Sequence, residues 1–434
     1  MSAISRRNFI QLSGVAAAVS TIGFSQILLA GKQAGHVVII GGGIGGATAA
    51  RYLKRADPNI KISIIEPKAN YFTCFMSNEV ISGERPIDTL KFGYKNLASM
   101  GVTIIQDYAE NIDVDKKQVL TKNNGRIAYD RCIVSPGIDF KWHTIDGYDA
   151  NIAANKIPHA WQAGAQTLLL RQQLETMKDG GTVIIAAPAN PFRCPPAPYE
   201  RASQIAHYLK HHKPKSKILI LDAKDSFAKF DLFMQGWKKH YAYGTDKSLI
   251  EWVKGTEGGI IEGVNAQTNT ILASGNEHKA DVLNIIPTQK SGKIAFSADL
   301  VNQQGWCPVN QQTFESTRHQ DIYVIGDASV ASPLPKSGYA ANSEAKVCAA
   351  AVVASLQGKS APTPTLINTC YSLITPDDGI SIAMVYHFDG NKIQQIKGAG
   401  GLTPMDSSPA MRKREARYAH SWFNNITHDV FGRQ

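Results

Sequence analysis

Apolar and polar positions along the chain form two long strand–turn–helix–strand patterns. The first has an apolar strand at 36–40, a glycine-rich turn, an alanine-rich helix and a second strand that ends at Glu66. The second has an apolar run at 182–188, a helical segment and a strand that ends near Asp222. Strands that alternate with helices predict parallel sheets. We therefore predict an α/β protein with two Rossmann-like nucleotide-binding domains.

The first turn has the composition of a dinucleotide-binding site. Gly41, Gly43 and Gly46 lie within the run GGGIGGATAARYLK. The first glycine permits a tight turn, the second lets phosphate approach the backbone, and the third lets the helix pack on the strand. Glu66 ends the next strand, where a carboxylate accepts hydrogen bonds from ribose hydroxyls. The glycine motif alone is a weak signal, but this context predicts a bound dinucleotide rather than an unrelated helix turn.

A segment far downstream favours FAD over NAD as that dinucleotide. The run STRHQDIYVIGDAS combines an apolar strand at 322–325 with Asp327, the pattern by which two-domain flavoproteins hold the ribityl chain. A helix follows from near Ser337, and the positive end of its dipole would favour a reduced anionic flavin. Lys336 would add to that effect, although a solvated surface lysine fits the sequence equally well. The FAD-binding domain is thus predicted in two segments, in a glutathione-reductase-like order.

The second turn lacks the glycines of a nucleotide site. It has the sequence ANPFRCPPAP, so close approach of a pyrophosphate, and with it nicotinamide binding, is not expected. Cys194 lies just before the helix, where the helix dipole and Arg193 are expected to lower the thiol pKa. Pro198 suits the first helical turn, and Glu200 lies in that turn. Glu200 is either a favourable charge at the helix N-terminus or a base beside the sulfur.

Near the C-terminus, an apolar stripe predicts a helix. Tyr418, Trp422, Ile426 and Val430 recur at helical spacing, so the helix should pack this stripe against a core.

The predicted organisation has five parts. They are a signal peptide and linker (1–34), the first segment of the FAD-binding domain (35–155), a second Rossmann-like domain without a NAD loop (156–285), the second FAD-binding segment (286–360) and a C-terminal α+β domain (361–434).

The N-terminus has the features of an export signal. The run SRRNFIQ places paired arginines before Phe9, and a moderately apolar segment follows to Ala30. This pattern is typical of a twin-arginine signal, which predicts export to the periplasm and cleavage near Ala30 or Ala34. A membrane anchor is the alternative, but polar residues interrupt the apolar run, and no later stretch approaches the roughly 20 apolar residues of a span. Stable membrane insertion is therefore not expected.

Charge and cysteine content narrow the partners and cofactors. The formal net charge is +10, and basic clusters at 210–217, 238–240 and 412–414 would attract anionic ligands or acidic partners, although scattered surface lysines explain them as well. No nucleic-acid partner is expected. The chain has 6 cysteines, none in a CxxC or CxxCH motif, so neither a metal site nor covalent haem is predicted in it. Disulfides would be ordinary in an oxidising compartment.

Sequence blocks that run in order from about His36 to Phe431 carry a family resemblance. They are VVIIGGGIGGATAARYLK, YFTCFMSNEV, YDRCIVSPG, PFRCPPAPYERAS, GWCPV, VIGDAS, PKSGYAANS, NTCYSLI and HSWFNNITHDVFG. Together they resemble the flavoprotein subunit of flavocytochrome c sulfide dehydrogenase, a relative of sulfide:quinone reductases and of the disulfide oxidoreductase flavoproteins.

The resemblance implies roles for individual residues. Cys74 matches the cysteine that the family bonds to the flavin 8α-methyl group, so covalent FAD is expected. Cys194 and Cys370 match a redox-active disulfide beside the flavin, and Glu200 matches the family's proposed base. Trp422 matches a residue in the wall of the flavin pocket. No role follows from the resemblance for the remaining cysteines, which are Cys132, Cys307 and Cys348.

The resemblance also implies a reaction and a partner. Sulfide would attack the disulfide by thiol exchange, giving a persulfide and a thiolate, and two electrons would reach FAD, with sulfur or polysulfide as product. We hypothesise that Cys194 carries the sulfur and Cys370 lies next to the flavin, with the order of attack left open. A separate c-type cytochrome subunit carrying haem c would accept the electrons in a heterodimer. The alternatives are a sulfide:quinone reductase at the membrane, a non-catalytic flavin-binding electron-transfer scaffold and, least favoured, a nicotinamide-linked disulfide reductase.

Overall fold

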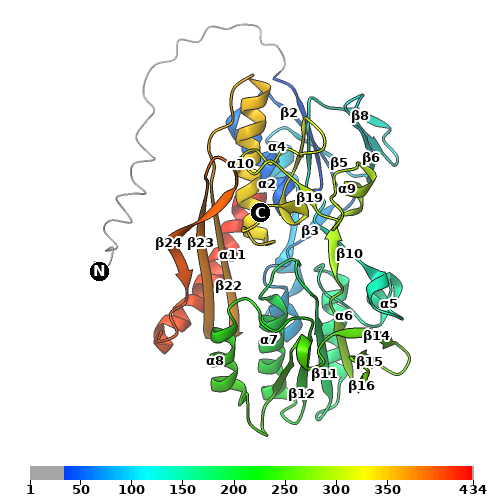
Figure 1. The fold of residues 1–434 in the computed structure, drawn as a ribbon, viewed down its shortest axis with the longest axis vertical. Coiled ribbons are helices and arrows are strands. Elements are labelled where there is room, and N and C mark those ends of the chain that lie inside the picture. The colour runs from blue at the N-terminus through cyan, green and yellow to red at the C-terminus, as the bar shows by residue number, and fades with distance from the viewer. Residues whose placement is uncertain (1–33, 433–434) are drawn as a thin grey trace. The chain divides into compact units, whose positions relative to one another are not determined.

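The computed structural model describes residues 34–432, which include two parallel sheets (Figure 1). The first sheet has the strand order β20-β9-β1-β2-β5, and every neighbouring pair is parallel. Its strands are β1 (His36–Ile40), β2 (Lys61–Ile65), β5 (Val102–Ile105), β9 (Arg131–Val134) and β20 (Ile322–Val324). Because β20 pairs with β9, the two predicted FAD-binding segments contribute to one sheet.

The second parallel sheet has the order β13-β12-β11-β17. Its strands are β11 (Thr182–Ala187), β12 (Lys217–Asp222), β13 (Ile250–Val253) and β17 (Val282–Ile285), and its helices are α6 (Ala165–Thr176), α7 (Ala197–His212) and α8 (Phe230–Tyr241). Pro198 and Glu200 lie in the first turn of α7, as the sequence predicts. These two sheets confirm the predicted α/β class with two Rossmann-like domains.

A third, antiparallel sheet and a long helix form the C-terminal part. The sheet consists of β22 (Thr365–Thr375), β23 (Asp378–Phe388) and β24 (Ile393–Leu402), and α11 (Pro409–Phe431) packs against β22 and β23. Ile426 and Val430 are buried on α11, but Tyr418 is 49% exposed, so the predicted stripe is wrong at that position. The buried face turns instead toward Ala416, Ala419 and Phe423, because small residues let the helix approach the strands closely.

Shorter elements connect and cover these sheets. Ser337 caps α10 (Gly338–Leu356) by accepting a hydrogen bond from the backbone N–H of Ala340 at 3.0 Å, and α10 packs on α2 (Ile44–Ala56). The other helices are α3 (Ser77–Ser82), α4 (Lys95–Ser99), α5 (Ala150–Asn155) and α9 (Lys293–Ser297). The other strands are β3 (Asn70–Phe72), β4 (Lys91–Gly93), β6 (Ala109–Asp113), β7 (Gln118–Thr121), β8 (Arg126–Ala128), β10 (Ile138–Phe140), β14 (Ile261–Asn265), β15 (Thr270–Ala273), β16 (Asn276–Lys279), β18 (Gln289–Ser291), β19 (Cys307–Pro308) and β21 (Ser329–Val330).

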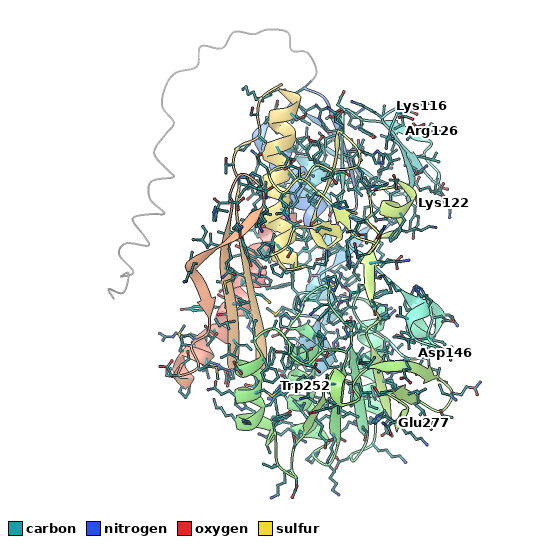
Figure 2. All side chains as sticks on the ribbon, in the orientation of Figure 1. Lys116, Lys122, Arg126, Asp146, Trp252 and Glu277 are labelled. Atoms are coloured by element: carbon teal, nitrogen blue, oxygen red, sulfur yellow. The ribbon has the colours of Figure 1, made fainter. Side chains whose placement is uncertain are left out.

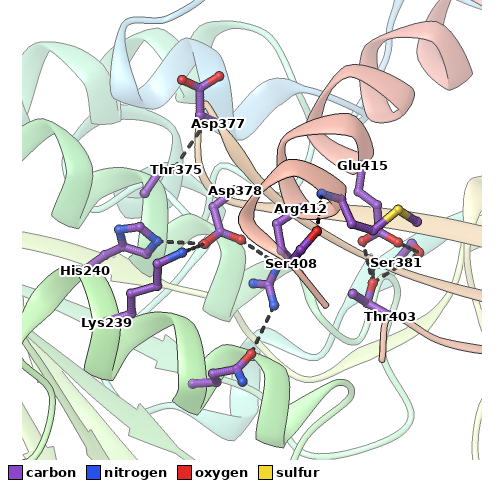
Figure 3. A network of polar contacts seen from close by, with 12 residues as sticks. Lys239, His240, Thr375, Asp377, Asp378, Ser381, Thr403, Ser408, Arg412 and Glu415 are labelled. Atoms are coloured by element: carbon purple, nitrogen blue, oxygen red, sulfur yellow. Dashed lines mark hydrogen bonds and ion pairs between the residues drawn. The ribbon is translucent and has the colours of Figure 1, made fainter. Parts of the chain in front are cut away.

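A polar network fastens the C-terminal sheet to the second Rossmann-like domain (Figure 3). The Asp378 carboxylate accepts hydrogen bonds from Arg412 Nε at 2.6 Å and Lys239 Nζ at 3.2 Å, and His240 Nε2 lies 2.7 Å from it. Arg412 is 5% exposed. The basic clusters at 238–240 and 412–414 therefore do not form only a solvated surface, because residues from both contact the Asp378 carboxylate. This network holds β22 and β23 against α8.

The predicted export signal lies outside the described residues, apart from Ala34. Residues 34–432 belong to one compact unit, and the predicted domain boundaries within it stay predictions. Across the described part of the chain, no helix has both the length and the apolar character needed to cross a bilayer.

Candidate active site

A large cavity lies where the first sheet, the second Rossmann-like domain and the C-terminal part meet. Its volume is about 960 Å³, near the upper end of the range of roughly 300–1,000 Å³ that small-molecule and cofactor sites occupy. Residues from all three parts line it, including Gly41, Gly43, Glu66, Cys74, Arg193, Cys194, Glu200, Asp327, Cys370 and Trp422. The structure therefore brings together nearly all of the sequence-predicted site residues at one cavity.

The turn between β1 and α2 needs its glycines. Gly41 has a φ of +97°, and a Cβ there would lie 2.3 Å from the carbonyl oxygen of Ser135. A Cβ on Gly46 would lie 1.9 Å from the carbonyl oxygen of Gly41. Gly43 lines the cavity, and the carboxylate of Glu66 accepts a hydrogen bond from the backbone N–H of Gly42 at 2.8 Å. The turn is thus closely packed on its inner side and open toward the cavity.

Several buried polar atoms along the cavity have no partner within the described chain. They are Asp327 Oδ1, Arg193 Nη2, Trp161 Nε1 and Trp422 Nε1. Burial raises the pKa of Asp327, while the charges of Arg193 and Lys336 lower it. Unpaired buried donors and acceptors carry a free-energy cost unless a ligand satisfies them. A polar dinucleotide offers complementary groups, so these residues fit FAD.

Cys74 and Trp422 both line the cavity. Cys74 is half-buried in the loop between β3 and α3, and its thiol donates to the Trp161 carbonyl oxygen at 3.6 Å. Trp422 packs edge-on against Phe75, with ring centroids 5.0 Å apart, and stacks near Tyr339 at 6.1 Å. This aromatic group leaves one side of Trp422 facing the cavity, which suits contact with a flat ring.

Lys336 occupies a different place from the one the sequence suggested. Its ammonium donates to the carbonyl oxygens of Asp327 and Ser329, both at 2.8 Å, and lies 3.9 Å from the centroid of the Trp306 ring. It is neither a solvated surface lysine nor one of the residues that line the cavity in the described chain. Burial lowers the pKa of Lys336, and its contacts hold the segment that presents Asp327.

Cys194 and Cys370 are brought together from distant parts of the sequence. Cys194 lies in the loop between β11 and α7 and Cys370 lies in β22; both are free thiols that line the cavity, close enough for each to shift the pKa of the other. Figure 1 shows β22 beside α7, which makes this approach possible. Cys194 has a φ of +57°, and its backbone N–H donates to the Lys336 carbonyl oxygen at 2.7 Å. The loop thus holds a non-glycine residue in the left-handed region, a conformation common at functional sites.

The electrostatics of the two thiols differ from the expectation for Cys194. Its pKa is raised, because it hydrogen-bonds to Cys370 and is buried, and these effects outweigh the nearby charge of Arg193. The pKa of Cys370 is lowered by the hydrogen bond with Cys194 and then by the charge of Lys229, against the opposing effect of burial. The prediction of an acidic Cys194 thiol is therefore wrong, and Cys370 is the thiol that is easier to ionise.

Lys229 is a site residue that sequence reasoning missed. It is 5% exposed and precedes the first residue of α8, and its ammonium donates to Ser372 Oγ at 3.0 Å and to the Cys370 carbonyl oxygen at 3.1 Å. The same nitrogen lies 3.9 Å from Cys370 Sγ. No local pattern around Lys229 indicates this role, because β22 brings its partners from far along the chain.

Glu200, in the first turn of α7, lines the cavity near both sulfurs. Its carboxylate accepts hydrogen bonds from the backbone N–H of Leu373 at 3.0 Å, Asn78 Nδ2 at 3.2 Å and Gln204 Nε2 at 3.4 Å. Burial raises the pKa of Glu200 to about 7, although the hydrogen bond from Leu373 lowers it. A carboxyl group with this pKa exchanges protons near neutral pH.

The place where a nicotinamide ribose would bind in the second domain is filled. Asp222 ends β12, is 0% exposed, and accepts hydrogen bonds from Tyr199 Oη and Lys224 Nζ, both at 2.5 Å. Trp252 on β13, labelled in Figure 2, donates to it at 3.0 Å. The Tyr199 ring stacks on Phe227 with centroids 3.4 Å apart. The Asp222 carboxylate is used for hydrogen bonds within the core rather than for a ribose. This agrees with the absence of nucleotide-site glycines from the turn after β11.

Comparison with known proteins gives family matches over most of the chain. Residues 167–287 match the family model "Sulfide dehydrogenase [flavocytochrome c] flavoprotein chain, central", residues 362–431 match "Flavocytochrome c sulphide dehydrogenase, flavin-binding", and residues 39–107 match "NAD(P)-binding Rossmann-like domain". The sulfide dehydrogenase [flavocytochrome c] flavoprotein chain of Chlorobaculum thiosulfatiphilum is 50% identical over 45 residues, which are 10% of this chain and 94% of that protein.

Longer but more distant matches point the same way. The mitochondrial sulfide:quinone oxidoreductase of Dictyostelium discoideum is 22% identical over 327 residues, which are 73% of this chain and 70% of that protein. The crystal structure of the sulfide:quinone oxidoreductase of Aquifex aeolicus superposes with a TM-score of 0.70 at 16% identity, covering 92% of this chain and 93% of that one. A NAD-dependent persulfide reductase from A. fulgidus has a TM-score of 0.59 at 16% identity, covering 89% and 76% of the respective chains.

The fold and the cavity define an FAD-binding oxidoreductase of the disulfide oxidoreductase-like superfamily. Within it, the chain belongs to the family of sulfide-oxidising flavoproteins that comprises flavocytochrome c sulfide dehydrogenase flavoprotein chains and sulfide:quinone oxidoreductases.

Proposed function

We propose that this protein oxidises hydrogen sulfide to sulfur or polysulfide through a Cys194–Cys370 disulfide and FAD, and passes the electrons to a c-type cytochrome subunit. The observation that carries the proposal is that the two thiols lie near each other at the wall of the dinucleotide cavity, where the phosphate loop of a second nucleotide site is missing. A disulfide at this place would lie between substrate and cofactor.

Residues of the chain supply the chemistry around the cofactor. Gly41, Gly43 and Glu66 would hold the adenosine diphosphate part of FAD, and Asp327 its ribityl chain. FAD, when bound, supplies a two-electron acceptor. Cys74 at the cavity wall would bond it covalently, which prevents loss of the cofactor.

Glu200 would manage the proton of the substrate. Its carboxylate takes a proton from H₂S, leaving hydrosulfide in the cavity, and its pKa of about 7 suits that transfer near neutral pH. Hydrosulfide attacks one sulfur of the disulfide, so that a new sulfur–sulfur bond forms, the Cys194–Cys370 bond breaks, and the electron pair of the broken bond stays on the other sulfur as a thiolate. The products of this step are a cysteine persulfide and a cysteine thiolate.

Anaerobic titration of the oxidised protein with sulfide tests the proposed activity. The account predicts bleaching of the flavin absorbance on addition of sulfide and recovery when oxidised cytochrome c is added. An unchanged flavin spectrum would support the non-catalytic electron-transfer scaffold instead.

A quinone acceptor is the second candidate, because several matching relatives are sulfide:quinone oxidoreductases. Parallel assays with horse-heart cytochrome c and with decylubiquinone separate the two candidates. We expect sulfide-dependent reduction of the cytochrome to be faster than that of the quinone. The reverse preference would make this protein a sulfide:quinone reductase.

The twin-arginine sequence supports a periplasmic location, since that route carries folded, cofactor-loaded proteins. Fractionation of the native host checks this proposal. Recovery of the protein with the periplasmic marker, together with a haem c polypeptide that co-purifies with it, is the expected result, and recovery with cytoplasmic markers would contradict it.

A further inference from the structure

Lys229 is 5% exposed, and within the described residues its ammonium forms no salt bridge with a carboxylate, although the charge of Glu200 acts on it from nearby. The contacts of its ammonium within residues 34–432 are Ser372 Oγ, the Cys370 carbonyl oxygen and Cys370 Sγ. None of these groups is anionic while Cys370 is a thiol or half of a disulfide. Lys224, a second lysine in the same domain, pairs with Asp222 at 2.5 Å. A buried ammonium without a counter-ion is costly, so an anion formed at Cys370 would be strongly stabilised.

We propose that Lys229 is the counter-ion of a Cys370 thiolate and thereby makes the redox disulfide asymmetric, so that sulfide attacks Cys194 and Cys370 is the leaving group. The proposal rests on the proposed function, because the asymmetry matters only if the disulfide reacts with sulfide. It assigns Lys229 as a charge-stabilising residue that contacts a reacting atom.

The exchange step then has one favoured direction. The sulfur of hydrosulfide bonds to Cys194 Sγ, the bond between Cys194 and Cys370 breaks, and its electron pair stays on Cys370 Sγ, 3.9 Å from Lys229 Nζ. The proton of hydrosulfide remains on the new persulfide, because Glu200 already holds the proton taken from H₂S. In thiol exchange the sulfur that forms the more stable thiolate leaves faster. Attack at Cys370 would instead leave the charge on Cys194, away from Lys229.

Other charged groups around the pair do not cancel this asymmetry. Arg193 neighbours Cys194 and favours its thiolate. The Glu200 carboxylate disfavours a thiolate at Cys194 and at Cys370 alike, so it does not distinguish the two sulfurs. The hydrogen bond between the two thiols and the charge of Lys229 both favour ionisation at Cys370. Cys194 is the thiol with the raised pKa and Cys370 the one with the lowered pKa, in agreement with the contacts.

The test measures ionisation of Cys370 in the chemically reduced holoprotein, without sulfide. Alkylation by iodoacetamide is followed against pH, and mass spectrometry quantifies the modified peptide of each cysteine. In Lys229→Met we expect the pH midpoint of Cys370 alkylation to rise by about one unit or more, equivalent to an ionisation constant about tenfold smaller. Lys229→Arg should keep the midpoint near that of the unsubstituted protein, because it restores the charge. Lys238→Met, an exposed position on the same helix, is the matched control and should titrate like the unsubstituted protein.

The outcomes separate this inference from the proposed function. A Cys370 titration that is the same in Lys229→Met and in the unsubstituted protein would overturn the role of Lys229. Absence of flavin bleaching by sulfide in the unsubstituted protein would overturn the function, whatever the titration shows.

A measurement on the unsubstituted protein avoids dependence on the folding of Lys229→Met. Rapid mixing with sulfide, quenching with an alkylating reagent and peptide mapping locate the persulfide. The extra sulfur is expected on the Cys194 peptide, and an extra sulfur on the Cys370 peptide would contradict the assignment.

Discussion

The turns after β1 and β11 occupy equivalent places in their two parallel sheets, yet they have opposite compositions. The first is rich in glycine, and added Cβ atoms at Gly41 and Gly46 would collide with backbone oxygens. The second turn carries Cys194 among prolines. The strand that follows it in the sheet ends at Asp222, whose carboxylate accepts hydrogen bonds inside the core. One Rossmann-like topology thus forms the glycine-rich wall of the cavity in one domain, while in the other it positions a sulfur at the wall of the same cavity.

The same comparison explains where the C-terminal part enters. In the proposed mechanism the cysteine in the second turn needs a partner, and that partner, Cys370, comes from β22 in another sheet. The Asp378 network holds that sheet against α8, and Lys229 at the start of α8 contacts Cys370. The proposed disulfide therefore depends on two different parts of the chain, each of which supplies one thiol.

Removal of the β22 thiol is expected to have the largest effect. Cys370→Ser should lower sulfide-dependent cytochrome c reduction by at least about a thousandfold, because no disulfide can form. The protein should remain yellow with bound flavin. Cys307→Ser is the control, since Cys307 is buried outside the residues that line the cavity in the described chain. Activity of Cys370→Ser near that of the control would sink the disulfide mechanism.

The second turn can be probed through Asp222. Asp222→Asn leaves the buried ammonium of Lys224 facing a neutral amide, and we expect a loss of about 3 kcal/mol in the free energy of unfolding. Urea unfolding followed by tryptophan fluorescence measures it. Asp225→Asn, at an exposed position in the next loop, should change stability little. If Asp222→Asn were fully stable and its flavin were reduced by NADH, the second site would be a working nicotinamide site after all.

Glu200→Gln tests whether the carboxylate beside the second turn transfers a proton. Because only the carboxylate accepts a proton, the unsubstituted protein should gain activity as pH rises through the Glu200 pKa of about 7. The variant should be about a hundredfold slower above that pH, and the difference should shrink below it, where the native carboxyl is protonated. Both proteins meet the same mixture of H₂S and hydrosulfide, so the ratio of their pH–rate profiles isolates Glu200. A ratio independent of pH would argue that Glu200 is only a helix N-terminal charge.

The smallest expected effect comes from removing the proposed covalent bond between Cys74 and FAD. Cys74→Ser should keep flavin bound in the native protein and lower activity by less than about tenfold, or roughly 1.4 kcal/mol of barrier. After denaturing electrophoresis, flavin fluorescence should migrate with the unsubstituted polypeptide and be absent from the variant band. Fluorescence absent from both bands would show that FAD is held without a covalent bond.

The sequence predicts local features of this protein well. The glycines after β1, the start of α7 at its prolines and the start of α10 at Ser337 all follow from backbone geometry, which neighbouring residues determine. The predicted site residues from both halves of the chain, apart from Gly46 and Lys336, also line one cavity, although their roles there remain predictions that the substitutions above test.

Features that depend on distant contacts could not be predicted. Lys229 resembles any other lysine until β22 brings Cys370 beside it. The ammonium of Lys336 donates hydrogen bonds to the carbonyl oxygens of Asp327 and Ser329, and these contacts hold it away from the cavity. The inverted acidity of the thiols arises because Cys194 hydrogen-bonds to Cys370, and no spacing within the sequence encodes that contact.

Non-reducing peptide mapping of the oxidised holoprotein, before and after one addition of sulfide under anaerobic conditions, tests the central claim most directly. The account predicts a peptide cross-linked between Cys194 and Cys370 that disappears on sulfide addition as the flavin absorbance bleaches. Cysteines that are never cross-linked, or a cross-link that survives while the flavin bleaches, would contradict it.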